Sequence, residues 1–215
     1  MLNRLASRFR SPDLDADDDD APHPECQLPP ATARRVAVHE AGRALVTAAL
    51  RPGALLTVAM PWMTAPSPGI RVRPLDSLPT ADMLLVQVKI ALAGKVAEAL
   101  LLGVAGMDHG GGEGSNLANA TITVVRLLTN GGFGARLTWT GAVTPATVGM
   151  LLRSDPVLAA EVERTLRVQF VSTHRLLARC HGALETVAGL LEQHGVVNGA
   201  IVERILATPI EGGIQ

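Results

Sequence analysis

Residues 36–46 read Val-Ala-Val-His-Glu-Ala-Gly-Arg-Ala-Leu-Val, and the rest of the chain is best interpreted from this stretch. Small or apolar side chains occupy most of its positions, so a helix formed here has no broad polar face. Such a helix is typical of the buried centre of a domain. Only His39, Glu40 and Arg43 interrupt the apolar run. In a helix, His39 and Arg43 are one turn apart and lie on the same face.

The residues His39 and Glu40 begin a pattern that differs at one position from the zinc-binding motif H-E-x-x-H. In that motif, two histidines one helical turn apart bind Zn²⁺, and the glutamate polarises the water bound to the metal. Here Arg43 stands in place of the second histidine. A guanidinium stays protonated and offers only hydrogen-bond donors, so Arg43 cannot bind a metal cation.

The composition predicts one globular domain with a largely aliphatic core. Of the 215 residues, 47% are apolar, 18% are charged and only 2% are aromatic, which suits close packing of helices. The formal net charge of -1 argues against a nucleic-acid-binding protein. Cys26 and Cys180 have no metal or redox spacing, so we expect a reducing, cytoplasmic compartment. No run of 18 uncharged apolar residues occurs, so we expect no transmembrane segment.

We predict an N-terminal tail over residues 1–30, a domain over residues 31–208 and a short C-terminal tail over residues 209–215. The N-terminal tail holds seven of the 20 acidic residues and three of the 19 basic residues. Four consecutive aspartates at 17–20 repel one another, and the prolines that follow cannot continue a helix. We therefore expect residues 1–30 to be disordered.

Turn and capping residues divide the domain into short elements. We predict helices over residues 31–50, 81–102, 115–129, 156–180, 183–193 and 199–206, with a further helical segment from Thr144-Pro145, and strands over residues 55–60 and 70–74. Thr80, Ser115 and Asn198 are suitable N-terminal caps. In the helix over residues 81–102, Lys95 and Glu98 are three residues apart, and of a buried pair and a surface pair we expect the surface pair. The predicted fold class is mainly α with a small β-sheet (α+β).

Four stretches of the chain resemble the peptidase domain of FtsH-type ATP-dependent zinc metallopeptidases. Residues 36–46 resemble its His-Glu-Ala-Gly-His helix, and residues 56–61 (Leu-Thr-Val-Ala-Met-Pro) resemble its following strand. Residues 93–103 (Ala-Gly-Lys-Val-Ala-Glu-Ala-Leu-Leu-Leu-Gly) resemble its Gly-Gly-Arg-x-Ala-Glu-Glu motif, and residues 112–121 resemble the start of the helix that carries the third metal ligand. The four stretches follow the family's order over residues 33–206. The resemblance implies the helical zincin-like fold of that domain, whereas the family's ATPase motif G-x-x-x-x-G-K-[ST] is not present.

The implied metal ligands differ from those of the family at two of three positions. In the family, two helix histidines and an aspartate hold zinc, and by position these fall on His39, Arg43 and Asn116. The amide of Asn116 is a poor substitute for a carboxylate, and a catalytic zinc site needs three protein ligands. We therefore expect no bound cofactor. We also expect Arg43 to pair with Glu40, which is then a counter-ion and not the catalytic base.

A rearranged metal site is the alternative. Asp108, His109 and Glu113 precede Asn116 in a glycine-rich loop, and the resemblance brings this loop near the helix of His39. With Arg43 turned outward, His39, His109 and Glu113 can bind Zn²⁺ or another metal, and Glu40 is then catalytic. The simpler interpretation is that His109 is a solvated loop residue and that Glu113 is stabilised by the start of a helix.

Three functions follow from the resemblance. The first is a non-catalytic peptide-binding or regulatory pseudopeptidase, in which an edge strand at residues 55–60 receives a peptide by strand addition through Val58, Ala59 and Met60. The second is an ATP-independent metallopeptidase that carries out proteolysis with the rearranged site. The third is a structural subunit, as a homo-oligomer or with an intact homologue, because the family's peptidase domains form rings.

Overall fold

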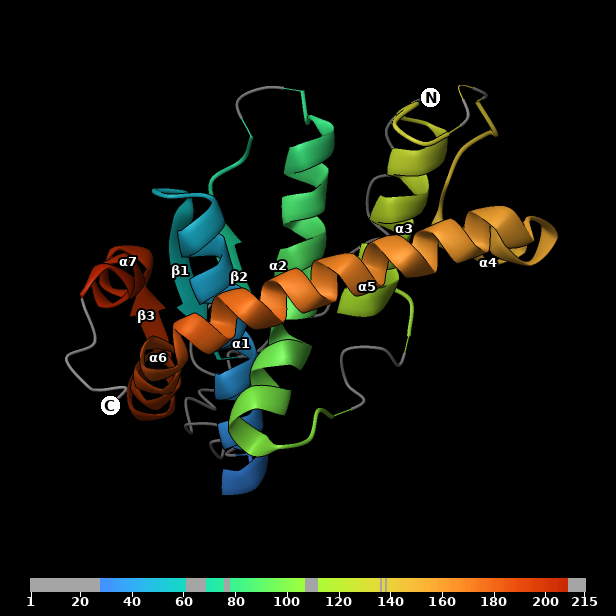
Figure 1. Cartoon of the computed structure of the whole chain (residues 1–215). Helices are drawn as coiled ribbons and strands as arrows, with labels where there is room; N and C mark the ends of the chain where they lie inside the picture. The colour runs from blue at the N-terminus through green and yellow to red at the C-terminus, as the bar shows by residue number, and fades with distance from the viewer. Residues whose placement is uncertain are drawn as a thin grey trace, which may run out of the picture.

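The computed structural model describes residues 28–60, 69–75, 78–106, 112–135, 137 and 139–208. Within these residues the chain forms seven helices and three strands (Figure 1). The helices are α1 (Pro30–Leu50), α2 (Ala81–Leu102), α3 (Asn116–Thr129), α4 (Pro145–Ser154), α5 (Pro156–Arg179), α6 (His181–His194) and α7 (Gly199–Ala207). The strands are β1 (Leu55–Ala59), β2 (Gly69–Val72) and β3 (Val196–Asn198). The prediction of a mainly helical chain with a small sheet is confirmed.

Helix α1 lies at the centre of the fold, in contact with α2, α6, α7 and the sheet. Its buried residues occur on more than one face, as its nearly continuous apolar sequence predicts. Helix α2 runs antiparallel to α1, since Arg35 of α1 contacts Glu98 of α2 whereas Gly42 lies against Ala93. A side chain at Gly42 would place its Cβ 2.8 Å from the backbone oxygen of Ala93, so glycine permits the close approach of the two helices.

The sheet has the order β2-β1-β3, and both pairings are antiparallel. Val58 lies opposite Ile70 of β2 and opposite Val197 of β3, so β1 is the central strand. The prediction that residues 55–60 form an edge strand is therefore wrong. The second neighbour of β1 is β3, a three-residue strand between α6 and α7 that was not predicted.

The buried apolar side chains form two clusters. The first surrounds α1 and includes Leu45, Val58, Leu184 and other residues of α2, α6, α7 and the sheet. The second lies among α2, α3, α4 and α5. Helix α5 crosses in front of α2 in Figure 1, and its Phe170 packs against both clusters. These two helices therefore join the sheet-bearing side of the molecule to the side formed by α3 and α4.

Capping side chains begin several helices where the sequence predicted them. Thr80 accepts a hydrogen bond from the amide of Met83, and Ser115 accepts one from the amide of Ala118. Asn198 caps α7 in the same way. The tails predicted over residues 1–30 and 209–215 lie almost wholly outside the described residues. Among the helices that are described, none has an apolar stretch long enough to cross a lipid bilayer.

Candidate functional site

Three charged or polar side chains of α1 lie one helical turn apart on one face. They are Arg35, His39 and Arg43, at positions i, i+4 and i+8. The face meets α2 and the first residue of α3. Polar groups in this position would destabilise the packing unless each had a partner. The structure supplies partners from α2, from the chain after α2, from α3 and from α1 itself, and of the buried side-chain nitrogens and oxygens described only Nε of Arg43 lacks one.

Glu98 of α2 is the centre of this polar cluster. Its Oε1 lies 2.8 Å from Nδ1 of His39, and its Oε2 accepts a hydrogen bond of 2.8 Å from Nη1 of Arg35. The backbone amide of Gly106 donates to the same Oε2 at 2.7 Å. Arg35 also donates to the carbonyl oxygen of Val104 at 2.9 Å. Glu98 is only 3% exposed and thus holds α1 against α2 and the chain that follows α2.

The surroundings of Glu98 favour its ionised form. Burial alone raises the pKa of this carboxyl group, but the hydrogen bonds from His39, the amide of Gly106 and Arg35 lower it by more. The result is a pKa lowered from 4.5 to about 2. Glu98 is therefore a buried carboxylate at neutral pH, compensated by the guanidinium of Arg35.

His39 is held at both ring nitrogens. The side-chain nitrogen Nδ2 of Asn116 lies 2.9 Å from Nε2 of His39. On the other side of the ring, Nδ1 donates its hydrogen to Glu98, because an ionised carboxylate can only accept. The ring is therefore fixed in orientation by Glu98 on one side and by Asn116 on the other.

Two glycines make room for the cluster. A Cβ at Gly94 of α2 would collide with the imidazole ring of His39, so the ring lies directly over the glycine backbone. A Cβ at Gly106 would lie 3.3 Å from Oε2 of Glu98. The position of the His39 ring thus depends on the absence of a side chain at Gly94, one helical turn before Glu98.

Arg43 pairs with Glu40, as the sequence predicted. Nη1 of Arg43 lies 3.0 Å from each carboxylate oxygen of Glu40. The start of β2 covers the pair, because a Cβ at Gly69 would lie 3.3 Å from Nη1 of Arg43 and 3.5 Å from Oε2 of Glu40. Gly69 has a φ of 95°, a conformation that favours glycine. Arg43 is therefore turned toward Glu40, and not outward as the rearranged site requires.

The donor set in this arrangement does not fit a zinc ion. Nε2 of His39 is already hydrogen-bonded to the side chain of Asn116, and Arg43 offers no lone pair. Both oxygens of Glu98 are also engaged. Within the described parts of the chain, no three His, Cys, Asp or Glu side chains come together in a group that could hold a metal ion.

The sequence-predicted site residues fall into three groups. His39, Glu40, Arg43 and Asn116 come together at the junction of α1, α2 and α3. Glu113 is exposed in the turn before α3, and His109 lies outside the described residues, so the rearranged site remains a prediction. Val58 and Ala59 lie in the central strand, and Met60 donates its amide hydrogen to the carbonyl of Gly195 at 2.8 Å.

A peptide therefore cannot add a strand beside Val58 and Ala59 without displacing β2 or β3. This corrects the predicted route of peptide binding, which required an open edge at residues 55–60. The outer strands of the sheet are β2 and β3.

Arg35 and Glu98 were not predicted as site residues. The expected surface pair of Lys95 with Glu98 is wrong, because Glu98 is buried and its side-chain partners are 59 and 63 residues away in the sequence. Two signals were available. Arg35 stands one turn before His39 on the same face, and Glu98 is the one acidic residue in an otherwise apolar stretch from Val96 to Leu102.

The comparisons with known proteins add no family assignment. No protein-family model and no curated protein matches the chain. The relationship to the FtsH-type peptidases consequently stays a resemblance, carried by the four sequence stretches.

Proposed function

We propose that the chain is a non-catalytic relative of the FtsH-type zinc peptidases that acts as a peptide-binding or regulatory domain. The observation that supports this most directly is the pairing of Arg43 with Glu40 at 3.0 Å. In that arrangement the carboxylate of Glu40 faces a guanidinium and not a metal-bound water. A protein-only polar cluster then occupies the place that the resemblance gives to a metal centre.

The distance between His39 and Asn116 supports the assignment of these positions. Two ligands of a tetrahedral zinc ion lie about 3.3 Å apart when each metal–ligand distance is about 2.0 Å. Nε2 of His39 and Nδ2 of Asn116 are 2.9 Å apart. A carboxylate oxygen at position 116 would thus lie at about the distance from Nε2 of His39 that two zinc ligands require. Position 43 lies one helical turn from His39.

This proposal is tested by restoring the two missing ligands. The variant Arg43→His with Asn116→Asp should bind about one zinc ion per chain, as a catalytic site with three protein ligands does, measured by metal analysis after dialysis. The unsubstituted chain should bind none after the same treatment. The matched control is Arg164→His with Asn119→Asp, which makes the same chemical changes at exposed positions.

Two results of this experiment contradict the proposal. Near-stoichiometric zinc in the unsubstituted chain would support the rearranged site of His39, His109 and Glu113. A restored variant that folds, as judged by circular dichroism, but binds no more zinc than the control would show that positions 43 and 116 are not the former ligand positions.

Proteolysis and assembly separate the remaining alternatives. We expect no digestion of casein by the unsubstituted chain, with or without added Zn²⁺. Digestion that depends on Zn²⁺ would indicate an ATP-independent metallopeptidase. The structural-subunit alternative predicts a ring, so light scattering after size exclusion should give a multiple of the 22.5 kDa chain mass.

Peptide binding, if it uses strand addition, requires an outer strand. The better candidate is β2, because it begins at Gly69 above the Arg43–Glu40 pair, whereas β3 is held between α6 and α7. Strand addition needs only backbone groups on the receiving strand, so this mode does not depend on a metal.

A further inference from the structure

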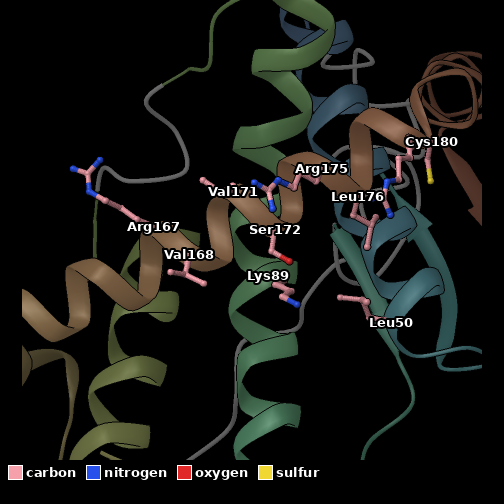
Figure 2. A pocket seen from close by; sticks show the side chains of 10 residues that line it. Leu50, Lys89, Arg167, Val168, Val171, Ser172, Arg175, Leu176 and Cys180 are labelled. Atoms are coloured by element: carbon pink, nitrogen blue, oxygen red, sulfur yellow. The ribbon is translucent and has the colours of Figure 1, made fainter.

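A groove runs along the C-terminal half of α5. It has a volume of about 710 Å³ and is bounded by α5, by Lys89 of α2 and by Leu50 at the end of α1. Figure 2 shows side chains from these three helices gathered around it. The polar cluster of His39 contributes no residue to its lining.

The charged side chains of the groove are all basic. They are Lys89, Arg167, Arg175 and Arg179. Arg167 is engaged by Glu163 at 2.6 Å. The other three form no ion pair with any described residue. The groove therefore has a positive charge that is not compensated within the described parts of the chain.

The floor of the groove is apolar. Val168 and Val171 of α5 are 55% and 46% exposed, and Leu50 at the end of α1 also lines the groove. A lining that combines exposed valines with cationic side chains suits an occupant that carries several negative charges and at least one apolar side chain.

The chain itself contains a segment with this chemistry. Residues 13–20 read Asp-Leu-Asp-Ala-Asp-Asp-Asp-Asp, with six carboxylates and the apolar side chain of Leu14. This acidic segment lies outside the described residues. We propose that the groove along α5 binds the acidic segment of the same chain. The inference does not depend on the proposed function, because the groove and the polar cluster share no residue.

The length of the intervening chain allows this contact. Helix α1 has 21 residues, so its first residue lies about 30 Å from Leu50 at the edge of the groove. Asp17 precedes Pro30 by 13 residues, which can span up to about 43 Å when extended. Tethering also helps, since a linker of this kind gives an effective concentration of the order of millimolar.

Cys180 provides a reporter, because it lines the groove and is half-buried. In a Cys26→Ser background it is the one remaining cysteine of the chain. The rate of alkylation of Cys180 by uncharged iodoacetamide is compared for the native acidic segment and for a segment with all six aspartates changed to asparagine. If the site has a dissociation constant of about 0.2 mM, neutralisation should accelerate alkylation about fivefold.

Reversing the charge of groove residues shows whether the protection of Cys180 depends on charge pairing with the acidic segment. Burial raises the pKa of the Cys180 thiol and Arg179 offsets part of that effect, so rates are compared only within one groove background. With Arg175→Glu and Arg179→Glu, the acidic and neutral segments should give equal rates. Changing the six aspartates to arginine in that background should restore protection. The control pair Arg153→Glu and Arg164→Glu lies outside the groove and should keep the fivefold effect.

A second measurement covers the case in which Cys180 is insensitive to the occupant. In a Cys180→Ser background, a nitroxide on Cys26 should broaden the methyl signals of Val168 and Val171. Neutralising the six aspartates, or adding about 1 M NaCl, should abolish the broadening because the charges are then removed or screened.

Three outcomes would overturn the proposal. The first is that neither alkylation nor broadening depends on the aspartates. The second is protection that is lost when the chain is diluted about 50-fold, which would place the acidic segment of a second copy in the groove, because only an intramolecular contact is independent of concentration. The third is binding to phosphatidylcholine–phosphatidylserine vesicles that is abolished by Arg175→Glu with Arg179→Glu while the aspartates have no effect on Cys180. That result would make the groove a lipid-binding surface.

Discussion

The polar cluster around His39 and the groove along α5 handle charge in opposite ways. In the cluster, Glu98 and Glu40 each have a guanidinium partner within 3.0 Å, and His39 has a partner at both ring nitrogens. In the groove, Lys89, Arg175 and Arg179 have no ion-pair partner among the described residues. The difference indicates that the charges of the cluster hold packed elements together, whereas these three groove cations take part in no such ion pair with a described residue.

The largest effect is expected from Glu98→Ala. Removing the carboxylate leaves Arg35, His39 and the amide of Gly106 without their common acceptor. We expect a loss of about 3 kcal/mol in the free energy of unfolding, measured with urea. The matched control is Glu163→Ala, which breaks an exposed ion pair with Arg167 and should cost less than about 0.5 kcal/mol. Equal losses in the two variants would show that the cluster does not hold α1 to α2.

The next effect is a dependence of stability on pH that comes from Glu98. Its pKa is lowered from 4.5 to about 2 by folding, so its ionised form stabilises the native state above pH 4.5. That contribution, about 3 kcal/mol, is lost as the pH falls from 4.5 through 2. The native chain should therefore be more stable than Glu98→Gln at about pH 7, and the gap should close toward about pH 2. A gap that is constant over this range would contradict the assignment.

A smaller effect is expected from Gly94→Ala, which places a methyl group where the ring of His39 lies. The ring must move away from Glu98 and Asn116, at a net cost of about 2 kcal/mol after the gain in helix propensity. The control is Gly189→Ala in α6, where an added Cβ would meet no atom within 4 Å. That control should be neutral or stabilising, by up to about 1 kcal/mol. A neutral Gly94→Ala would mean that His39 is not held over this glycine.

The smallest effect is expected in the groove. Arg175→Gln and Arg179→Gln together should change the free energy of unfolding by less than about 0.5 kcal/mol, because neither side chain has an ion-pair partner among the described residues to lose. Urea denaturation of the neutral-segment variant is the appropriate measurement, since it removes any contribution from the acidic segment. A loss above about 1 kcal/mol would show that the groove cations stabilise the fold, as the polar cluster does.

The sequence was sufficient for features with a local cause. The starts of α2, α3 and α7 follow from the caps Thr80, Ser115 and Asn198, each of which accepts a hydrogen bond from an amide two or three residues away. The pairing of Arg43 with Glu40 is also local, because the two residues are neighbours on one helix.

Features that join distant segments could not be predicted in the same way. Lys95 offered Glu98 an obvious partner on its own helix, but the actual side-chain partners come from α1, 63 and 59 residues earlier. Strand β3 has three residues, too few to show an alternating pattern, and it exists because β1 pairs with it. Whether β1 is an edge strand or the central strand depends on β3, which the sequence pattern did not reveal.

The central position of β1 has a consequence for protein synthesis. Its second neighbour, β3, is translated roughly 140 residues later, which is about 7–28 s at ordinary rates of elongation. During that interval, one side of β1 in the nascent chain has no native strand to pair with. An unpaired strand edge is a template for pairing with other chains, so crowded polysomes expose this protein to misassembly until residues 196–198 have left the ribosome.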